Sequence, residues 1–391
     1  MKTIHKLGCG LALFALGLGG AAHAAEPLKI GMVLPMSGPF SAYGQQILSG
    51  AKLYLNEHGN KLGDRPVELI VKDDTGIAPE LSKRAAQELV VQDKVAILGG
   101  FGLTPLAFAA APVATQAKVP MIVMNAATSS ITTKSPYIVR TSMTLPQVTA
   151  PMATWAAKNG IKKVYTLVAD FGPGHDAEKQ FVKTFTAAGG EIVGQVRTPL
   201  SNPDFAPFLQ RIKDAKPDAV FLFVPAGEQG VAFLKGFKQR GLDAAGIRLI
   251  STGDLTGEDV IDSMGNEAVG VVTSMHYAEA HDSALNKAYV NAYYKTDPKT
   301  RPNFMSVAGY DGMHLIDAVL KKTGGDANGD KFIAAAKGIK FESPRGPIAI
   351  DPETRDIIQT VYIRKVERVD GKLQNVEFDS IPNVKDPGKE K

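Results

Sequence analysis

Short apolar runs alternate with longer amphipathic segments along most of the chain. The run at 28–34 is mostly apolar, which predicts a buried strand, and in the next segment Ile47, Ala51 and Leu55 recur at helical spacing on one face. The same alternation continues to residue 124. This first series predicts strands at Leu28–Leu34, Val67–Val71, Val95–Leu98 and Pro120–Met124, and helices at Tyr43–His58, Ala78–Gln92 and Pro105–Gln116.

A second series of the same kind begins near residue 163. Strands that alternate with helices favour parallel sheets covered by helices on both faces, so two such series predict two doubly wound α/β domains. The predicted strands are Lys163–Val168, Glu191–Val196, Ala219–Val224, Arg248–Ile250 and Val269–Ser274, and the predicted helices are Gly174–Ala188, Phe205–Asp214 and Glu228–Arg240.

The rest of the chain does not fit a third separate domain, because it contains little predicted sheet. A better explanation is that the chain returns to the first domain after about residue 275 and crosses again near 352. This predicts a first lobe of 25–143 plus 276–352, a second lobe of 144–275 plus 353–391, and a hinged cleft between them. The polar end, 383–391, is expected to fray. The predicted elements here are helices at Ser283–Thr296, Met305–Lys322 and Asp330–Lys337, and strands at Ile348–Ile350 and Ile357–Val366.

The first 24 residues have the pattern of a secretory signal peptide. Lys2 and Lys6 precede an apolar run at 11–22, and Ala22-His23-Ala24 has small residues at both positions that a signal peptidase reads. The run is shorter than the ~20 apolar residues of a membrane-spanning helix. The single cysteine, Cys9, lies before the apolar run, which argues against a lipid anchor there. We therefore expect a periplasmic protein without disulfides.

Composition narrows the function further. The chain has 44% hydrophobic and 21% charged residues, as in ordinary soluble proteins. Lysine and arginine total 44 against 40 acidic residues, a balance too even to predict a nucleic-acid partner. No second apolar stretch approaches membrane length.

Motifs for catalysis are absent. The sequence has no G-x-S-x-G, H-E-x-x-H or P-loop pattern, and nothing connects Ser129, Ser130 and His175 into a nucleophile with a base. We therefore expect no enzymatic activity, no cofactor and no metal site.

A glycine-rich turn offers a candidate binding site. Gly99-Gly100-Phe101-Gly102 follows a predicted strand, and Thr104 is expected to cap a helix whose first residue is Pro105. A helix N-terminus at the carboxyl end of a parallel sheet favours an anion, and without a neighbouring basic residue it suits a small carboxylate. The alternative is a capped helix with no ligand. The next turn, 125–130, is rich in hydroxyl and small side chains and lies at the same sheet edge.

Several short motifs follow one another in an order and spacing that resemble a known family. They are Ile30-Gly31, Leu34-Pro35, Ser37-Gly38-Pro39, Tyr43-Gly44, Asp73-Asp74-Thr75, Asp93-Lys94-Val95 with Gly99, Asn125-Ala126-Ala127-Thr128 and Asp170-Phe171-Gly172. From about residue 28 to 363 the chain resembles periplasmic solute-binding proteins of the leucine/isoleucine/valine-binding type, the receptors of ATP-driven importers. The resemblance implies a bilobal fold with three crossings, a monomer, and a membrane permease as partner.

The resemblance also implies ligand contacts. Tyr43 matches a tyrosine that borders the ligand, and the Ala126-Ala127-Thr128 turn matches backbone and hydroxyl contacts to the ligand carboxylate. Asp254 stands where the family usually has a glutamate that holds the ligand ammonium. The alternative for Asp254 is a cap on a helix near 255–262.

Other positions depart from the family pattern. Leu103 replaces a serine that binds carboxylate, with Thr104 as a possible substitute, and Phe171 replaces a tyrosine. A further tyrosine position falls near Ala226 or Gly227, which leaves room. The implied pocket is wider and more apolar than a branched-chain site.

We therefore predict a periplasmic solute-binding receptor that closes on an apolar amino acid and delivers it to an ABC permease. An aromatic carboxylic acid such as a benzoate or cinnamate is the alternative ligand. A sensory receptor and a periplasmic hydrolase are the alternatives from other classes.

Overall fold

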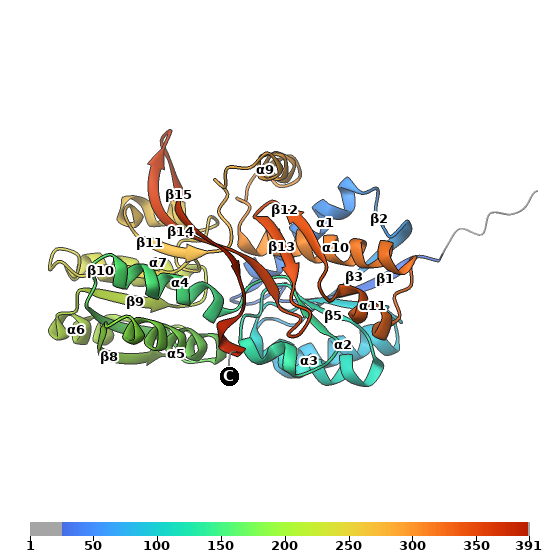
Figure 1. Ribbon diagram of the computed structural model, residues 1–391, viewed down its shortest axis with the longest axis horizontal. Coiled ribbons are helices and arrows are strands. Elements are labelled where there is room, and N and C mark those ends of the chain that lie inside the picture. Colours follow the sequence, from blue (N-terminus) through green and yellow to red (C-terminus); the bar gives the residue numbers. More distant parts are fainter. Residues whose placement is uncertain (1–25, 390–391) are drawn as a thin grey trace, which may run out of the picture.

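The computed structural model describes residues 26–389 of the chain. The predicted signal segment, 1–24, and its Cys9 lie outside the described residues. The described chain forms an elongated molecule with two α/β lobes side by side, each built around its own sheet (Figure 1). Within residues 26–389 no helix is both long and apolar enough to cross a bilayer.

The sheet of the first lobe has six strands in the order β2-β3-β1-β4-β5-β6. All neighbours pair in parallel except the short β2–β3 hairpin. This places the carboxyl ends of β1, β4 and β5 at one edge of the sheet. The strands are β1 (Leu28–Leu34), β2 (Lys61–Leu62), β3 (Arg65–Asp73), β4 (Ile97–Gly100), β5 (Met121–Val123) and β6 (Ile138–Arg140).

Helices cover both faces of this sheet. Successive residues of a strand point to opposite faces, so Met32 of β1 joins the core that contains Ile47, whereas Val33 joins the core that contains Leu89 and Ala107. The helices that pack around this sheet are α1 (Ser41–Glu57), α2 (Pro79–Val91), α3 (Thr104–Ala117), α9 (Ala284–Thr296), α10 (Phe304–Thr323) and α11 (Gly329–Ala336).

Helix α10 brings the chain back to the first lobe and packs on α1 with the two backbones in near contact. A Cβ atom added at Gly50 would lie 1.7 Å from the carbonyl oxygen of Ser306, and one at Gly309 would lie 2.1 Å from that of Ile47. Only glycine permits this approach. The pair is further held by Tyr54 Oη, which donates to Asp317 Oδ2 at 2.9 Å.

The second sheet has nine strands. Its central strands β7 to β11 pair in parallel, and β14 then runs antiparallel to β11 and forms a hairpin with β15. The strands are β7 (Lys163–Ala169), β8 (Glu191–Thr198), β9 (Ala219–Phe223), β10 (Arg248–Thr252), β11 (Val272–Met275), β12 (Lys340–Ser343), β13 (Gly346–Ile350), β14 (Ile357–Val369) and β15 (Lys372–Val384).

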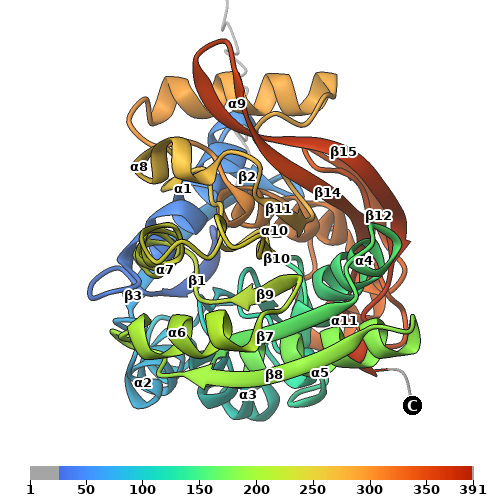
Figure 2. The same cartoon turned by 90° about the vertical axis from the view of Figure 1, so that its left-hand side faces the viewer.

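Helices flank this sheet as well, and Figure 2 shows them from the side of the second lobe. Phe181 of α5 stacks on Phe221 of β9 with ring centroids 4.2 Å apart, whereas Phe233 of α7 packs with Leu222 in a separate core on the opposite face. The helices are α4 (Leu145–Lys158), α5 (Gly172–Ala187), α6 (Ala206–Ala215), α7 (Glu228–Gln239) and α8 (Ile261–Met264).

The chain passes between the lobes three times, after β6, after β11 and between β13 and β14. The long strand β14 spans the junction, because its first residues pair with β13 and residues 362–365 pair with β11. The predicted fold class, two doubly wound lobes joined by a three-crossing hinge, is confirmed.

The expectation that residues 383–391 fray is wrong as far as residue 389. Strand β15 continues to Val384, and a short 3₁₀ helix, η3 (Pro387–Lys389), follows. The side chain of Asp386 accepts hydrogen bonds from Ser129 and Thr144, and Lys389 contacts Asp356. These polar residues are ordered by buried partners that lie far away in the sequence.

The close approach of α1 and α10 gives a stability prediction. Gly50→Ala places a methyl group against the Ser306 carbonyl, and we expect a loss of about 1–3 kcal/mol of unfolding free energy. This exceeds the gain of at most ~1 kcal/mol from the better helix propensity of alanine. Urea unfolding measures the change, and Lys52→Ala on the exposed side of α1 is the control. A Gly50→Ala protein more stable than wild type would contradict this packing.

Candidate functional site

The N-terminus of α3 lies where β4 ends. Gly100 and Phe101 both have positive φ angles, 101° and 65°, which turn the chain sharply out of the sheet. The expectation that Thr104 caps α3 is wrong: the helix begins at Thr104, and Leu103, with φ −130° and ψ 151°, occupies the N-cap position. No side chain caps the helix. Its first N–H groups are therefore not occupied by a side-chain acceptor.

The hydroxyl of Thr104 instead meets the next turn. Thr104 Oγ1 and Thr128 Oγ1 are hydrogen-bonded at 3.0 Å. Asn125 Nδ2 donates to the Gly102 carbonyl at 2.7 Å, and the Ala126 N–H donates to the Phe101 carbonyl at 3.0 Å. The N–H of Ala126 is thus already hydrogen-bonded within the protein. The hydroxyl groups of Thr104 and Thr128 form the side-chain hydrogen bond that connects the two turns.

The second lobe contributes aromatic rings. Phe171 precedes α5 at its N-cap position, and α5, like α3, has no side-chain cap. Phe171 stacks on Phe223 with ring centroids 6.0 Å apart and an interplanar angle of 19°. Tyr43 of the first lobe reaches across, and its hydroxyl donates to the carbonyl oxygen of Ala226 at 3.1 Å.

These residues enclose a small cavity between the lobes, with a free volume of about 30 Å³. Of the residues predicted from sequence, Tyr43, Leu103, Thr104, Ala126, Ala127, Phe171 and Asp254 line it. The other three predicted residues do not line it. Thr128 is hydrogen-bonded to Thr104, the carbonyl of Ala226 accepts from Tyr43, and Gly227 has neither contact. Sequence reasoning missed Gly102, Asn125, Met143, Leu145, Pro173, Phe223 and Pro225.

Some of the missed residues carried a usable signal. Phe223 and Pro225 lie at the carboxyl end of a parallel strand, where ligands of such sheets bind, and Gly102 and Asn125 belong to turns that had been singled out. Met143 and Leu145 belong to no motif.

Asp254 is the acidic residue among those that line the cavity. Its side chain is buried, and Thr252 Oγ1 donates to its Oδ2 at 2.7 Å. Burial raises the pKa of Asp254 to about 6, because the loss of water outweighs the stabilisation of the carboxylate by Thr252 and by the nearby Arg364. The alternative that Asp254 caps a helix near 255–262 is wrong, since α8 begins only at Ile261.

The surroundings of Asp254 are also buried. Arg364 of β14 lies in contact with the Gly253 carbonyl at 3.5 Å and with Glu258 at 3.7 Å. Burial, and then the charge of Asp254, raise the pKa of Tyr43 well above its usual value, so the phenol stays protonated. Among the residues described as lining the cavity there is no lysine or arginine.

The two lobes are in contact around the cavity. The backbone N–H of Ser129 in the first lobe donates to Asp176 Oδ2 of α5 at 2.8 Å. A Cβ atom added at Gly172 would lie 2.6 Å from Thr128 Oγ1. With so little free volume, a ligand enters only when the lobes separate.

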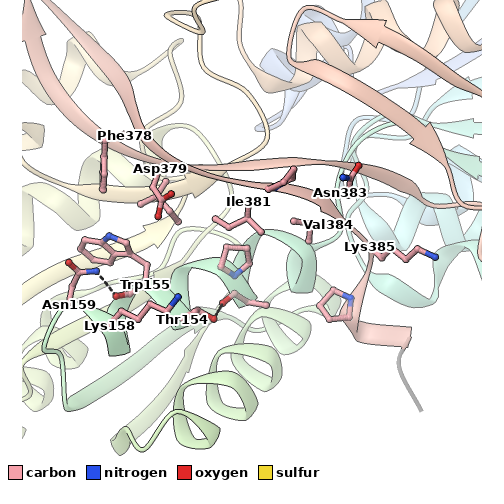
Figure 3. Close-up of a pocket in the computed structure, with 15 residues that line it drawn as sticks. Thr154, Trp155, Lys158, Asn159, Phe378, Asp379, Ile381, Asn383, Val384 and Lys385 are labelled. Atoms are coloured by element: carbon pink, nitrogen blue, oxygen red, sulfur yellow. Dashed lines mark hydrogen bonds between the residues drawn. The ribbon is translucent and has the colours of Figure 1, made fainter.

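A larger groove, of about 820 Å³, lies between α4 and β15 (Figure 3). Trp155 and Phe378 stand at one end of it, edge to face with centroids 6.2 Å apart, and Lys385 stands at the other. None of the ligand residues predicted from sequence lines this groove.

The uncapped helix ends, the aromatic rings and Asp254 converge on the interlobe cavity, which is therefore the candidate site. Within residues 26–389, no cluster of three or more His, Cys, Asp or Glu side chains is arranged to hold a metal ion.

Two lobes with a candidate site in the cleft between them are typical of solute-binding receptors. The chain belongs to the periplasmic binding protein family, which matches residues 27–372. Proteins of this family serve as the receptors of ABC transporters in the periplasm, so the receptor role predicted from sequence is confirmed.

Named relatives differ in the ligand attributed to them. The chain is 45% identical to "Leu/Ile/Val-binding protein homolog 6" of Brucella melitensis over 379 residues, 96% of this chain and 97% of that protein. It is 58% identical, with a TM-score of 0.90, to a solute-binding protein of Rhodopseudomonas palustris BisB5 solved with 3,4-dihydroxybenzoic acid, covering 93% and 99% of the two chains. A second R. palustris solute-binding protein, solved with 4-hydroxybenzoate, is 46% identical with a TM-score of 0.90 and the same coverage.

The contact between Gly172 and Thr128 gives a prediction about closure. In Gly172→Ala the new methyl group meets Thr128 Oγ1, so we expect the lobes to close less well and ligand affinity to fall about tenfold, for a cost near 1.4 kcal/mol. The melting temperature of the ligand-free protein should not fall, because alanine favours the helix. Calorimetric titration measures the affinity, and Thr186→Ala at the far end of α5 is the control. Unchanged affinity would show that this contact is not part of the ligand-bound form.

Proposed function

We propose that this receptor binds an aromatic carboxylic acid of the hydroxybenzoate type and passes it to an inner-membrane ABC permease. The chain is exported, and its signal segment is cleaved after Ala24. It acts as a monomer without catalysis of its own, with residues 25–143 and 276–352 as one lobe and 144–275 and 353–391 as the other. Closure of the lobes on the ligand makes the form that the permease recognises.

The ligand carboxylate is placed at the N-terminus of α3. The observation that carries the proposal is that this end has no side-chain cap and no basic neighbour in the cavity. Backbone N–H groups and one hydroxyl of the hydrogen-bonded Thr104–Thr128 pair are therefore the available donors. The positive end of the helix dipole adds to their effect. Such a site suits one negative charge on a small ligand.

The ligand ring is placed among the aromatic side chains of both lobes. Phe171 and Phe223 stack in nearly parallel planes, and Tyr43 lies on the other lobe. Flat walls of this kind favour a planar ring over a branched aliphatic chain. The hydroxybenzoates bound by two relatives of 58% and 46% identity support this ligand class.

Asp254 fits an anionic ligand as well as a cationic one. Its pKa of about 6 lets the carboxyl become neutral when an anion enters the cavity. Thr252 and Arg364 already stabilise its charged form, so the ligand need not supply an ammonium group. A neutral carboxyl can also donate a hydrogen bond.

An apolar amino acid is the second candidate. The names of the Brucella relatives favour it, and Asp254 is the acid that would hold the ammonium group. A buried carboxylate is stabilised by such a partner. The sign of the pH dependence separates the two ligands.

We expect the affinity for 4-hydroxybenzoate to rise as the pH falls from 8 to 6. The entering anion raises the pKa of Asp254 above its value of about 6, so binding takes up a proton. The ligand carboxyl, with an ordinary pKa of ~4, stays ionised in this range. Tyr43, protonated throughout, and Arg364 face Asp254 and do not titrate there. Calorimetric titration at three pH values measures the trend. Leucine binding that strengthens from pH 6 to 8, with no binding of hydroxybenzoates, would overturn the aromatic-acid proposal.

Asp254→Asn tests the same residue by substitution. The amide cannot ionise, so hydroxybenzoate binding should stay within about threefold at pH 6 and lose its pH dependence. Binding of an amino acid should instead weaken by at least ~100-fold, because an ammonium group would be buried without its counter-charge. Thr252→Val, which removes only the hydroxyl that donates to Asp254, is the matched control. Loss of hydroxybenzoate binding in Asp254→Asn at every pH would contradict the proposed role.

A further inference from the structure

The turn at 125–130, called the ligand turn below, is held by hydrogen bonds from one buried side chain, that of Arg140. Arg140, the last residue of β6, is fully buried. Its Nη2 donates to the Thr128 carbonyl at 2.7 Å, and its Nη1 donates to the carbonyls of Ala126 and Met143 at 3.2 and 3.3 Å. Two of these three carbonyls belong to the ligand turn. Arg140 thereby fixes the peptide planes that follow Ala126 and Thr128.

The charge of Arg140 is matched by a residue from the third crossing. Arg140 Nε lies 3.0 Å from Asp356 Oδ1, and both side chains are buried. Asp356 directly precedes β14, so this ion pair joins the ligand turn to the last passage of the chain between the lobes. A buried arginine left without its acid would be costly, which makes the orientation of Asp356 important to the turn.

Residues near the C-terminus also contact Asp356 and the ligand turn. Lys389 Nζ contacts the other oxygen of Asp356 and the hydroxyl of Thr132, which lies two residues beyond the ligand turn. Three residues earlier, Asp386 Oδ1 accepts from Ser129 Oγ at 3.0 Å. A Cβ atom added at Gly388 would lie 2.2 Å from that same Ser129 Oγ, so the tail passes close against the turn. Residues 386–389 are called the tail below.

We propose that Arg140 and Lys389 are positioning residues for ligand binding: Arg140 holds the ligand turn directly, and Lys389 acts on it through Asp356 and Thr132. The proposal rests on the interlobe site described under the proposed function. The Thr128 hydroxyl and its partner Thr104 bind a carboxylate well only if the turn is already held in place, because a mobile turn loses conformational entropy on binding. The tail is thus a determinant of affinity, although none of its residues lines the cavity.

The chain supplies a matched pair of lysines for a test. Lys389 is largely buried and contacts Asp356, whereas Lys385, four residues before it, is exposed and pairs with Asp351 at 3.1 Å. Lys389→Met and Lys385→Met therefore remove the same charge from the same segment. With 4-hydroxybenzoate and with leucine as probes, we expect Lys389→Met to raise the dissociation constant of the bound probe about tenfold, as for the loss of a hydrogen bond to a charged group. Lys385→Met should change it less than twofold, and Lys389→Arg should restore it.

Amide hydrogen exchange of residues 125–130 in the ligand-free protein gives a readout that needs no ligand. Lys389→Met should speed exchange there, and Lys385→Met should not. Unchanged exchange in Lys389→Met, or faster exchange with unchanged affinity, would overturn the positioning role. If wild-type protein binds neither probe, the proposed ligand classes fail while the exchange data still decide whether the tail holds the turn. If wild-type protein binds a probe but Thr128→Val does not weaken it, the proposed site fails instead.

Discussion

The ligand turn is the constraint on which the rest of the structure depends. It is the place where first-lobe backbone meets the second lobe, through Ser129 N–H and Asp176, and where the buried ion pair of Arg140 and Asp356 joins the hinge. Each lobe has its own sheet and covering helices. The position of one lobe against the other rests on the three crossings and on contacts of this kind. In this arrangement the cavity between the lobes contains almost no free space.

The charges of the site follow from the same arrangement. Basic side chains lie outside the lining of the cavity, where Arg140 holds carbonyls and Arg364 lies beside Asp254. The cavity itself presents hydroxyls, aromatic rings, uncapped helix ends and the carboxyl of Asp254. In the proposed function, a ligand anion therefore meets neutral donors that are held in place by buried ions.

Periodicity in the sequence predicted most of the fold, and the departures have physical causes. Helix α4 was missed because it carries Pro146 and Pro151, and proline usually ends or breaks a helix. Strand β15 was missed because its residues are largely polar. The two turns of the site were found, since turns at the carboxyl ends of parallel strands meet at one edge. The contacts of Arg140, Arg364 and Lys389 were not, because each joins residues far apart in sequence and no local pattern records such pairs.

The most direct measurement is a crystal structure of the protein with 4-hydroxybenzoate. The account predicts the ligand between the lobes, with its carboxylate at the N-terminus of α3 within hydrogen-bond distance of Thr104 or Thr128, and its ring beside Phe171. The ligand in the groove between α4 and β15, or in the cleft with its carboxylate turned toward Arg364, would contradict it.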